Sequence, residues 1–231
     1  MIERVGQLAS SVLVGIATAV VILALAIVPF VNPGWVGFEQ GRARADAWTG
    51  YTPAQLRRAT DAILSDLIVG PPNFDIAVDG QADLNARERE HMADVRRVFV
   101  ALAALAVVSA VVLLVAHRLW RGTAAFWRPV RWGAAALAIA VVTVGILGTV
   151  AFDLTFEVFH RLLFPAGSYS FDPRTDRLVQ LFPEEFWFET GLAVGALILL
   201  LTLVTWRLGA VRSAGVAARH EPVAAGLEAW R

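Results

Sequence analysis

The sequence of 231 residues contains no cysteine and no lysine. Without cysteine, the chain can form neither a disulfide framework nor a thiolate nucleophile. It also lacks a G-x-S-x-G elbow, an H-E-x-x-H motif and a glycine-rich phosphate loop, so the common sequence signatures of serine, zinc and nucleotide sites are missing. Charged residues make up only 17% of the chain, whereas 57% is hydrophobic. This composition excludes a soluble globular domain.

Long uncharged runs take the place of these missing features. A membrane-spanning helix needs roughly 20 apolar residues, and four stretches approach or exceed that length: residues 8–31, 98–116, 133–152 and 187–206, the last being the uncharged run Gly191–Trp206 lengthened at its N-terminal end. No small-x-small cleavage site follows the first run, so we interpret it as an uncleaved anchor. We therefore predict an all-α membrane protein with four transmembrane helices in a single domain, residues 1–231.

Arginine is distributed unevenly around these runs. The two terminal segments and the short connection His117–Trp132 together hold nine arginines and three acidic residues, a net charge of +6, and the remaining segments hold eleven arginines and seventeen acids, a net charge of −6. Short basic connections tend to stay in the cytoplasm. We therefore predict that both termini are cytoplasmic and that residues 32–95 and 153–189 are extracytoplasmic, where they form a small cap.

The predicted cap contains several local signals. Thr52-Pro53-Ala54-Gln55 is typical of a helix start and precedes an amphipathic helix, and Asp79-Gly80 indicates a tight hairpin. Pro33–Trp48 has the character of a loop. The third spanning helix is expected to begin at Pro129 and to continue without a break to Phe164, where Pro165 stops it.

The polar segment before the second span carries the first candidate site residues. Asn85 is a suitable N-cap and Glu88 completes a capping box, so a helix should start there and continue into the span. His91 lies seven residues before that apolar run, and His160 lies eight residues after the third one. At about 1.5 Å per residue, both stand roughly 10–12 Å outside the hydrocarbon, on neighbouring helices. His117 and His220 have ordinary interpretations as interface or solvent residues.

His91 and His160 each follow a glutamate by three residues, in Glu88-x-x-His91 and Glu157-x-x-His160. This spacing places carboxylate and imidazole on one helix face, and Asp94 falls on the same stripe as His91. Two chemistries remain open: acid–base catalysis by imidazoles that carboxylates orient, or a metal or haem site in a four-helix bundle. A non-catalytic membrane scaffold is a third possibility. A di-iron site would also need two further glutamates at the same depth; Glu39 and Glu189 are the only candidates near those helix ends, and both are expected at the periphery.

Three motifs resemble one family of small bacterial membrane proteins, the lipoprotein intramolecular transacylases, or Lit family. They are R-E-R-E-H-M-A-D-V-R-R before the second span, F-E-V-F-H-R-L-L-F after the third, and F-D-P-R-T-D-R-L-V-Q-L-F-P-E-E-F-W before the fourth. The resemblance implies an enzyme that moves the sn-2 acyl chain of an S-diacylglyceryl lipoprotein onto the α-amine of its N-terminal cysteine, giving the lyso form. It implies His91 and His160 as the catalytic residues.

The resemblance also sets the expected partners. These are diacylglyceryl-modified bacterial lipoproteins and membrane lipid, with no nucleic acid, no cofactor and no metal. Because the substrate amine is the nucleophile, no enzyme nucleophile is needed. We expect Glu88, Asp94 and Glu157 to orient the imidazoles, and the oxyanion donor to be one of Arg96, Arg97, Arg161 and Trp187. The active site is expected on the extracytoplasmic face of the cell membrane.

Overall fold

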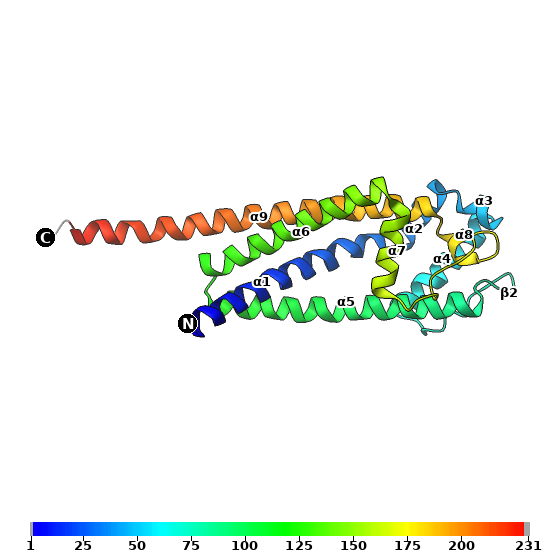
Figure 1. The fold of residues 1–231 in the computed structure, drawn as a ribbon, viewed down its shortest axis with the longest axis horizontal. Coiled ribbons are helices and arrows are strands. Elements are labelled where there is room, and N and C mark those ends of the chain that lie inside the picture. Colours follow the sequence, from blue (N-terminus) through cyan, green and yellow to red (C-terminus); the bar gives the residue numbers. More distant parts are fainter. Residues whose placement is uncertain (1, 229–231) are drawn as a thin grey trace. The chain divides into compact units, whose positions relative to one another are not determined.

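In a computed structural model, residues 2–228 are described, with side chains for residues 5–214. The elements in chain order are α1 (Ile2–Ile27), η1 (Val28–Phe30), α2 (Pro33–Arg42), α3 (Ala45–Thr49), α4 (Pro53–Ile68), β1 (Ala77–Val78), β2 (Gln81–Ala82), α5 (Ala86–Leu119), α6 (Ala124–Val150), α7 (Phe152–Leu163), α8 (Arg177–Leu181) and α9 (Glu184–Glu228) (Figure 1). Four helices, α1, α5, α6 and α9, contain segments long and apolar enough to cross a membrane. The predicted all-α, four-span fold is confirmed.

The contacts within the chain define two compact units. Unit 1 comprises residues 1–26, 103–142 and 196–231, and unit 2 comprises residues 27–102 and 143–195. Both candidate histidines, His91 and His160, belong to unit 2.

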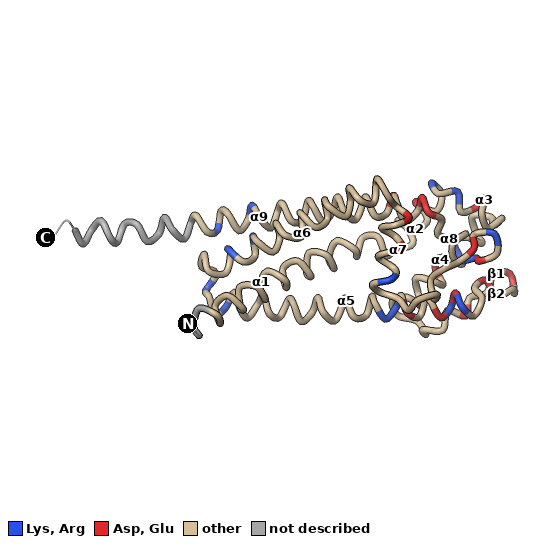
Figure 2. The backbone as a smooth tube through the Cα atoms, viewed as in Figure 1, with Lys and Arg blue, Asp and Glu red and all other residues tan. Residues whose placement is uncertain are grey.

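Unit 1 is held together by close helix packing. In this unit α1 and α6 cross at Gly15 and Gly133, where a Cβ on Gly133 would collide with the Gly15 carbonyl oxygen. Small residues allow such backbone approach between membrane helices, where van der Waals packing replaces the hydrophobic effect. A small buried cluster around Val14 and Phe126 lies beside this crossing. Every charge that Figure 2 colours in unit 1 is an arginine.

Unit 2 has the larger core, and α4 is central to it. Thr52 accepts from the Gln55 backbone N–H and Gln55 reaches back to the Thr52 N–H, so the predicted capping box is confirmed. The helix then buries one apolar face, including Ile63 at 1% exposure, against Phe74 and Leu181. Fully burying a side chain of this size contributes about 1.5–3 kcal/mol.

Two further parts of unit 2 test the local predictions. The expected hairpin is present: β1 and β2 pair antiparallel around Asp79 and Gly80, which both have positive φ. The loop predicted for Pro33–Trp48 is wrong, because α2 and α3 occupy this stretch. Asn32 caps α2 by accepting from the Gly34 and Trp35 N–H groups, and Pro33 occupies its first turn. Asn-Pro was thus a helix-start signal.

The third spanning helix also differs from the prediction at both ends. It starts at Ala124, since the Thr123 carbonyl accepts from Phe126 and Trp127, and Pro129 lies inside it. It ends at Val150, because Ala151 adopts φ −147° and ψ 66°, and a separate helix, α7, begins at Phe152. The predicted unbroken helix to Phe164 is therefore wrong. The break lets α7 take a direction of its own within unit 2.

Candidate active site

The N-terminus of α5 places His91. The Asn85 side chain accepts from the Arg87 and Glu88 N–H groups, and Glu88 Oε2 accepts from the Asn85 N–H at 2.7 Å. This confirms the predicted capping box. An N-cap side chain of this kind stabilises a helix by about 1 kcal/mol. His91 follows in the next turn and is only 6% exposed. Its Nδ1 atom is buried and has no hydrogen-bond partner among the described residues.

The second histidine lies on α7, an amphipathic helix. His160 is 8% exposed, although most of the residues around it on α7 are exposed. Its Nδ1 lies 2.8 Å from the Phe156 carbonyl oxygen. Because a carbonyl only accepts, Nδ1 of the neutral ring carries the proton and Nε2 keeps its lone pair. The helix backbone thus fixes His160 in the tautomer of a base.

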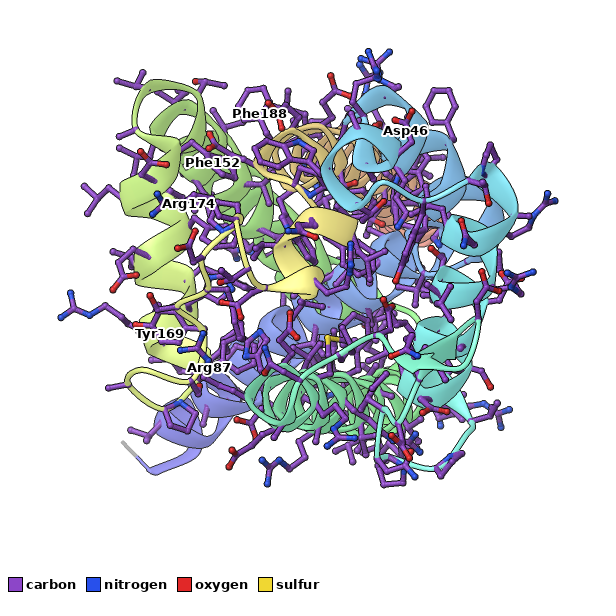
Figure 3. The ribbon with its side chains drawn as sticks, turned by 90° about the vertical axis from the view of Figure 1, so that its right-hand side faces the viewer. Asp46, Arg87, Phe152, Tyr169, Arg174 and Phe188 are labelled. Carbon is purple, nitrogen blue, oxygen red and sulfur yellow. The ribbon has the colours of Figure 1, made fainter. Side chains whose placement is uncertain are left out.

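The two imidazoles lie next to each other, as predicted from their equal distance outside the hydrocarbon on neighbouring helices. Their ring centroids are 6.2 Å apart and their planes differ by 26°. Aromatic rings surround both of them, with centroid distances of 4.0–5.5 Å; the neighbours are Phe156, Phe159, Phe164, Tyr169 and Phe171. Figure 3 labels Tyr169 on the loop that follows α7. Aromatic side chains therefore enclose the histidine pair.

This enclosure alters the acid–base properties of His160. Burial lowers the pKa of His160 below the ordinary histidine value of 6.5, and the hydrogen bond to Phe156 and the nearby Glu157 carboxylate partly oppose that shift. Desolvation disfavours the imidazolium. At neutral pH the ring is therefore neutral and able to accept a proton at Nε2.

The predicted supporting acids contact other groups. Glu88 Oε1 accepts from the Leu178 N–H at 2.6 Å, so both of its oxygens serve backbone donors rather than His91. Asp94 pairs with Arg97 one turn later on α5. Glu157 accepts from the Tyr169 hydroxyl at 3.2 Å. None of these three carboxylates therefore forms a direct hydrogen bond to His91 or His160. Each of them accepts from, or pairs with, another group instead.

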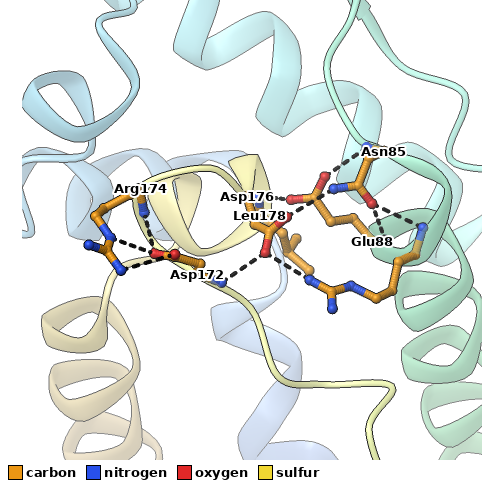
Figure 4. Close-up of polar contacts among 7 residues, drawn as sticks. Asn85, Glu88, Asp172, Arg174, Asp176 and Leu178 are labelled. Carbon is orange, nitrogen blue, oxygen red and sulfur yellow. Dashed lines mark hydrogen bonds and ion pairs between the residues drawn. The ribbon is translucent and has the colours of Figure 1, made fainter.

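Glu88 instead joins a tether between α5 and the segment before α9. Asp176, 6% exposed, accepts from Asn85 Nδ2 at 3.0 Å and from the Asp172 N–H at 2.8 Å (Figure 4). Arg87 donates to the same carboxylate at 2.9 Å. With the Glu88–Leu178 bond, these contacts fix residues 172–178 to the start of α5.

The tether also holds an aromatic ring against His91. The Arg87 guanidinium lies 5.0 Å from the Phe171 ring, and that ring lies 5.5 Å from the ring of His91. Such a cation–π contact contributes about 0.5–1 kcal/mol at exposed sites and more when desolvated. Arg87 thus bonds Asp176 on one side and covers Phe171 on the other.

A second anchor lies just beyond, at the start of α8. Arg177 donates to the Thr49 carbonyl at 2.8 Å and covers the Tyr51 ring at 4.7 Å. The Tyr51 hydroxyl donates to Asp83 at 2.5 Å. Burial is the larger cause and this hydrogen bond the smaller one of a shift that raises the pKa of Tyr51 to about 12. Burial also raises the pKa of Asp83. Tyr51 therefore remains a hydrogen-bond donor throughout the physiological pH range.

Sequence reasoning missed Asp176, Phe171 and Tyr169. A partial signal was available, because all three stand within or beside the third resemblance motif and its preceding loop. The aromatic residues at Phe156 and Phe164 also occur at helical spacing from His160. The packing of Phe164 on His91, which lies more than seventy residues earlier in the chain, could not be read from that spacing.

The four predicted oxyanion donors do not converge on the imidazoles. Arg96 donates to the Asp66 and Gly70 carbonyls at the end of α4. Arg97 pairs with Asp94. The other two, Arg161 and Trp187, are exposed. The ring of Tyr169, which carries a hydroxyl donor, lies 5.2 Å from the ring of His160.

The metal or haem alternative is not favoured. No group of three or more histidine, aspartate and glutamate side chains suited to a metal ion occurs in the described part of the chain. The two additional glutamates that a di-iron site would need, Glu39 and Glu189, instead flank Arg42, at 3.6 and 2.6 Å. Glu88 and Glu157 are likewise engaged elsewhere.

The fold and the histidine pair define a class: a multi-pass membrane protein with two buried imidazoles suited to proton transfer. A sequence profile of the lipoprotein intramolecular transacylase Lit matches residues 12–187. The chain therefore belongs to the Lit family, and its enzymatic activity is that of a lipoprotein intramolecular transacylase. No curated protein sequence matches the chain significantly.

Solved structures agree in fold. The in meso structure of the membrane-integral Lit from Bacillus cereus has a TM-score of 0.73 at 22% identity, covering 89% of this chain and 95% of that one. A variant of the same protein with one histidine replaced by arginine has a TM-score of 0.70 at 21% identity, covering 91% and 93%. A variant with histidine replaced by alanine has a TM-score of 0.64 at 22% identity, covering 91% and 94%.

Proposed function

We propose that the enzyme moves the sn-2 acyl chain of an S-diacylglyceryl lipoprotein to the α-amine of the lipidated N-terminal cysteine, with His91 and His160 as its catalytic residues. The single observation that carries the proposal is the pair of buried imidazoles with ring centroids 6.2 Å apart. One small reacting centre, an amine beside an ester, fits between groups at this spacing.

The reaction needs a proton removed at one atom and supplied at another. The amine nitrogen attacks the sn-2 ester carbon, forming the C–N bond while the carbonyl electrons move to oxygen, and a base takes a proton from nitrogen. The intermediate then collapses: the bond from carbon to the glyceryl oxygen breaks, and an acid protonates that oxygen. The products are an amide and a free sn-2 hydroxyl, so no water or co-reactant is consumed.

The two histidines divide these roles. His160 is the base, since its Nδ1 proton is held by the Phe156 carbonyl and the Nε2 lone pair is free. The carbonyl then also stabilises the imidazolium that forms, as an orienting group does in a catalytic triad. His91, whose ring lies 6.2 Å from that of His160, passes the proton that His160 has taken to the departing oxygen, so both rings are neutral again after one turnover. Its partnerless Nδ1 gains a hydrogen-bonding group when substrate enters.

The aromatic enclosure contributes orientation and exclusion of water. Excluding water protects the ester from hydrolysis and strengthens each hydrogen bond at the reacting atoms. Holding amine and ester together replaces a bimolecular encounter, an effect that reaches roughly 7–11 kcal/mol in well-oriented systems. Glu88 and Asp176 hold the loop before α8 against α5 through the tether. Glu157 holds Tyr169 by a hydrogen bond, and its negative charge raises the pKa of His160.

The active site is placed on the extracytoplasmic face, with both termini in the cytoplasm. Support comes from the charge split of +6 and −6 between the two sets of segments and from the positive-inside rule. The partners are diacylglyceryl lipoproteins and the surrounding membrane lipid, with no nucleic acid. The segments 32–95 and 153–189 form the cap on that side.

The test uses purified enzyme with a synthetic S-diacylglyceryl lipopeptide that carries a deuterated sn-2 chain. Substrate and product are isomers of equal mass, so fragmentation spectra and mild alkali are needed: an amide-linked chain survives alkali and an ester-linked chain does not. We expect the deuterated chain on nitrogen. We expect His91→Gln and His160→Gln to lower the rate by a factor of about 10² or more, whereas His117→Gln, on the same helix as His91, retains activity.

Three results would contradict the proposal. The deuterium could remain in an ester, both site variants could turn over at the wild-type rate, or an acylated enzyme could accumulate. Thermal unfolding of each variant is measured alongside, because both histidines are buried. An N-acetylated lipopeptide, which has no free amine, should not react.

A further inference from the structure

A groove of about 810 Å³ lies within unit 1, and the catalytic proposal does not use it. It is formed by the first half of α1, by Trp120, which directly follows α5, and by the start of α6. The lining residues are Gln7, Leu8, Ser10, Ser11, Val12, Gly15, Trp120, Ala125, Arg128, Pro129, Trp132 and Gly133. Its size falls within the roughly 300–1,000 Å³ of ligand-binding clefts in proteins.

The floor of the groove is apolar. Leu8 and Val12 of α1 contribute aliphatic surface, and the groove ends where Gly15 meets Gly133. The two nearby serines direct their hydroxyls to helix carbonyls one turn back. This floor suits a hydrocarbon chain that lies along the two membrane-spanning helices.

The rim, in contrast, presents three polar donors. Arg128 and Trp132 are exposed, and Trp120 is partly buried. Among the described residues, neither the Arg128 guanidinium nor the two indole N–H groups have a hydrogen-bond or ion-pair partner. Three unpartnered donors at the mouth of an apolar groove favour an anionic oxygen group above a hydrocarbon chain.

The surrounding charge has one sign. Within residues 5–214, unit 1 contains six arginines and no acidic residue, and four of them, Arg118, Arg121, Arg128 and Arg131, belong to the end of α5, the start of α6 or the turn between them. Figure 2 shows blue segments in this region and no red ones. A basic pocket between membrane helices is a favourable site for an anionic lipid head group. Tryptophan indoles also prefer the membrane interface.

The rim is fixed in place before any ligand binds. Trp120 packs on the small core around Val14 and Phe126. The chain then turns through Arg121 and Gly122, both at positive φ, and a Cβ at Gly122 would approach His117 Nε2 to 2.9 Å. A preformed rim loses little conformational entropy on binding.

We propose that this groove binds one anionic phospholipid. Its phosphate lies at Arg128 between the indole N–H groups of Trp120 and Trp132, and one acyl chain covers Leu8 and Val12. A free phosphate ion would use only the rim and leave the apolar floor exposed. A phospholipid satisfies both parts.

The experiment is native mass spectrometry of the full chain released from detergent, which counts bound lipid molecules. Phosphatidylglycerol and phosphatidylcholine with identical chains are compared, with inorganic phosphate as a separate arm. We expect one phosphatidylglycerol to bind preferentially. Arg128→Gln should weaken it roughly fivefold, since a basic residue near an anionic head group contributes about 1 kcal/mol. Trp132→Ala, at a position 68% exposed, should also weaken it.

Arg118→Gln is the matched control, because it removes the same charge from the end of α5 at an exposed position outside the groove lining. It should leave phosphatidylglycerol binding unchanged. The proposal is overturned if phosphatidylcholine binds equally well, if Arg118→Gln and Arg128→Gln weaken binding equally, or if inorganic phosphate displaces the lipid. Unchanged melting temperatures of the three variants establish that each is folded.

Discussion

His160 combines burial with a fixed tautomer, and that combination defines what it can do. The Phe156 carbonyl holds the proton on Nδ1, while the enclosing rings disfavour the charged form. Glu157 partly opposes this desolvation through its charge, although the carboxylate itself is half exposed. A neutral ring with a free Nε2 is thus a consequence of one backbone contact and one aromatic environment.

The first prediction concerns the pH dependence of the rate. His160 must be neutral to act as a base, so activity is present above its pKa and is lost as the pH falls through it. Glu157→Gln removes a carboxylate that raises this pKa, so the acidic limb should move to lower pH. The glutamine oxygen can still accept from the Tyr169 hydroxyl.

The measurement is the initial rate of N-acyl product formation across the acidic range. The substrate amine titrates near pH 7.7–8.0, but it contributes equally to every variant, so the difference between variants isolates the enzyme group. Asp153→Asn, one turn earlier on α7 and also exposed, is the control and should not shift the limb. A shift to higher pH in Glu157→Gln would reject His160 as the base.

At the scale of elements, the position of the loop between α7 and α8 depends on α5. Asp176 accepts hydrogen bonds from Asn85, Arg87 and the Asp172 backbone N–H. Arg87 in turn lies over the ring of Phe171. The helix that carries His91 therefore also positions the ring that packs on it. The cap of α5 therefore contributes to the wall of the candidate active site.

The second prediction tests this tether with Asp176→Asn. The substitution removes the ion pair with Arg87 and leaves at least one part-buried donor without an acceptor, which costs less than the about 1–3 kcal/mol of a fully buried group. We expect a lower melting temperature in detergent. We also expect a lower turnover rate, because Phe171 loses its fixed place beside His91.

Asp172→Asn is the matched control in the same loop. The side chain of Asp172 pairs with Arg174, but both are exposed to solvent, so the effect should be smaller. Figure 4 shows the two carboxylates on neighbouring stretches of the loop. If Asp176→Asn lowers stability yet leaves turnover intact, the tether is structural and does not position the site.

At the scale of the whole molecule, the distribution of charge is the basis of the proposed orientation in the membrane. The described part of unit 1 carries only arginine, whereas unit 2 carries both signs (Figure 2). Positive charge in short connections is retained in the cytoplasm. The proposed orientation would place the histidine pair on the extracytoplasmic side.

The third prediction is a labelling result. Because the chain has no cysteine, single cysteines can be introduced at Gln81, on the exposed strand β2, and at Arg212, on the exposed surface of α9. A membrane-impermeant maleimide should label Gln81→Cys in intact cells. It should label Arg212→Cys only after permeabilisation, and the reverse pattern would invert the proposed topology.

The sequence by itself determined the four spans, the capping of α4 and α5 and the hairpin at Asp79-Gly80, because each depends on residues close together in the chain. It also predicted that His91 and His160 lie together, since helix rise fixes their heights. The tertiary structure alone decided the break before α7, the aromatic enclosure and the tether through Asp176. The tether depends on contacts between residues that are some ninety positions apart in the chain. Only packing decides which donors Glu88 and Asp176 accept from, and this packing cannot be read from local sequence.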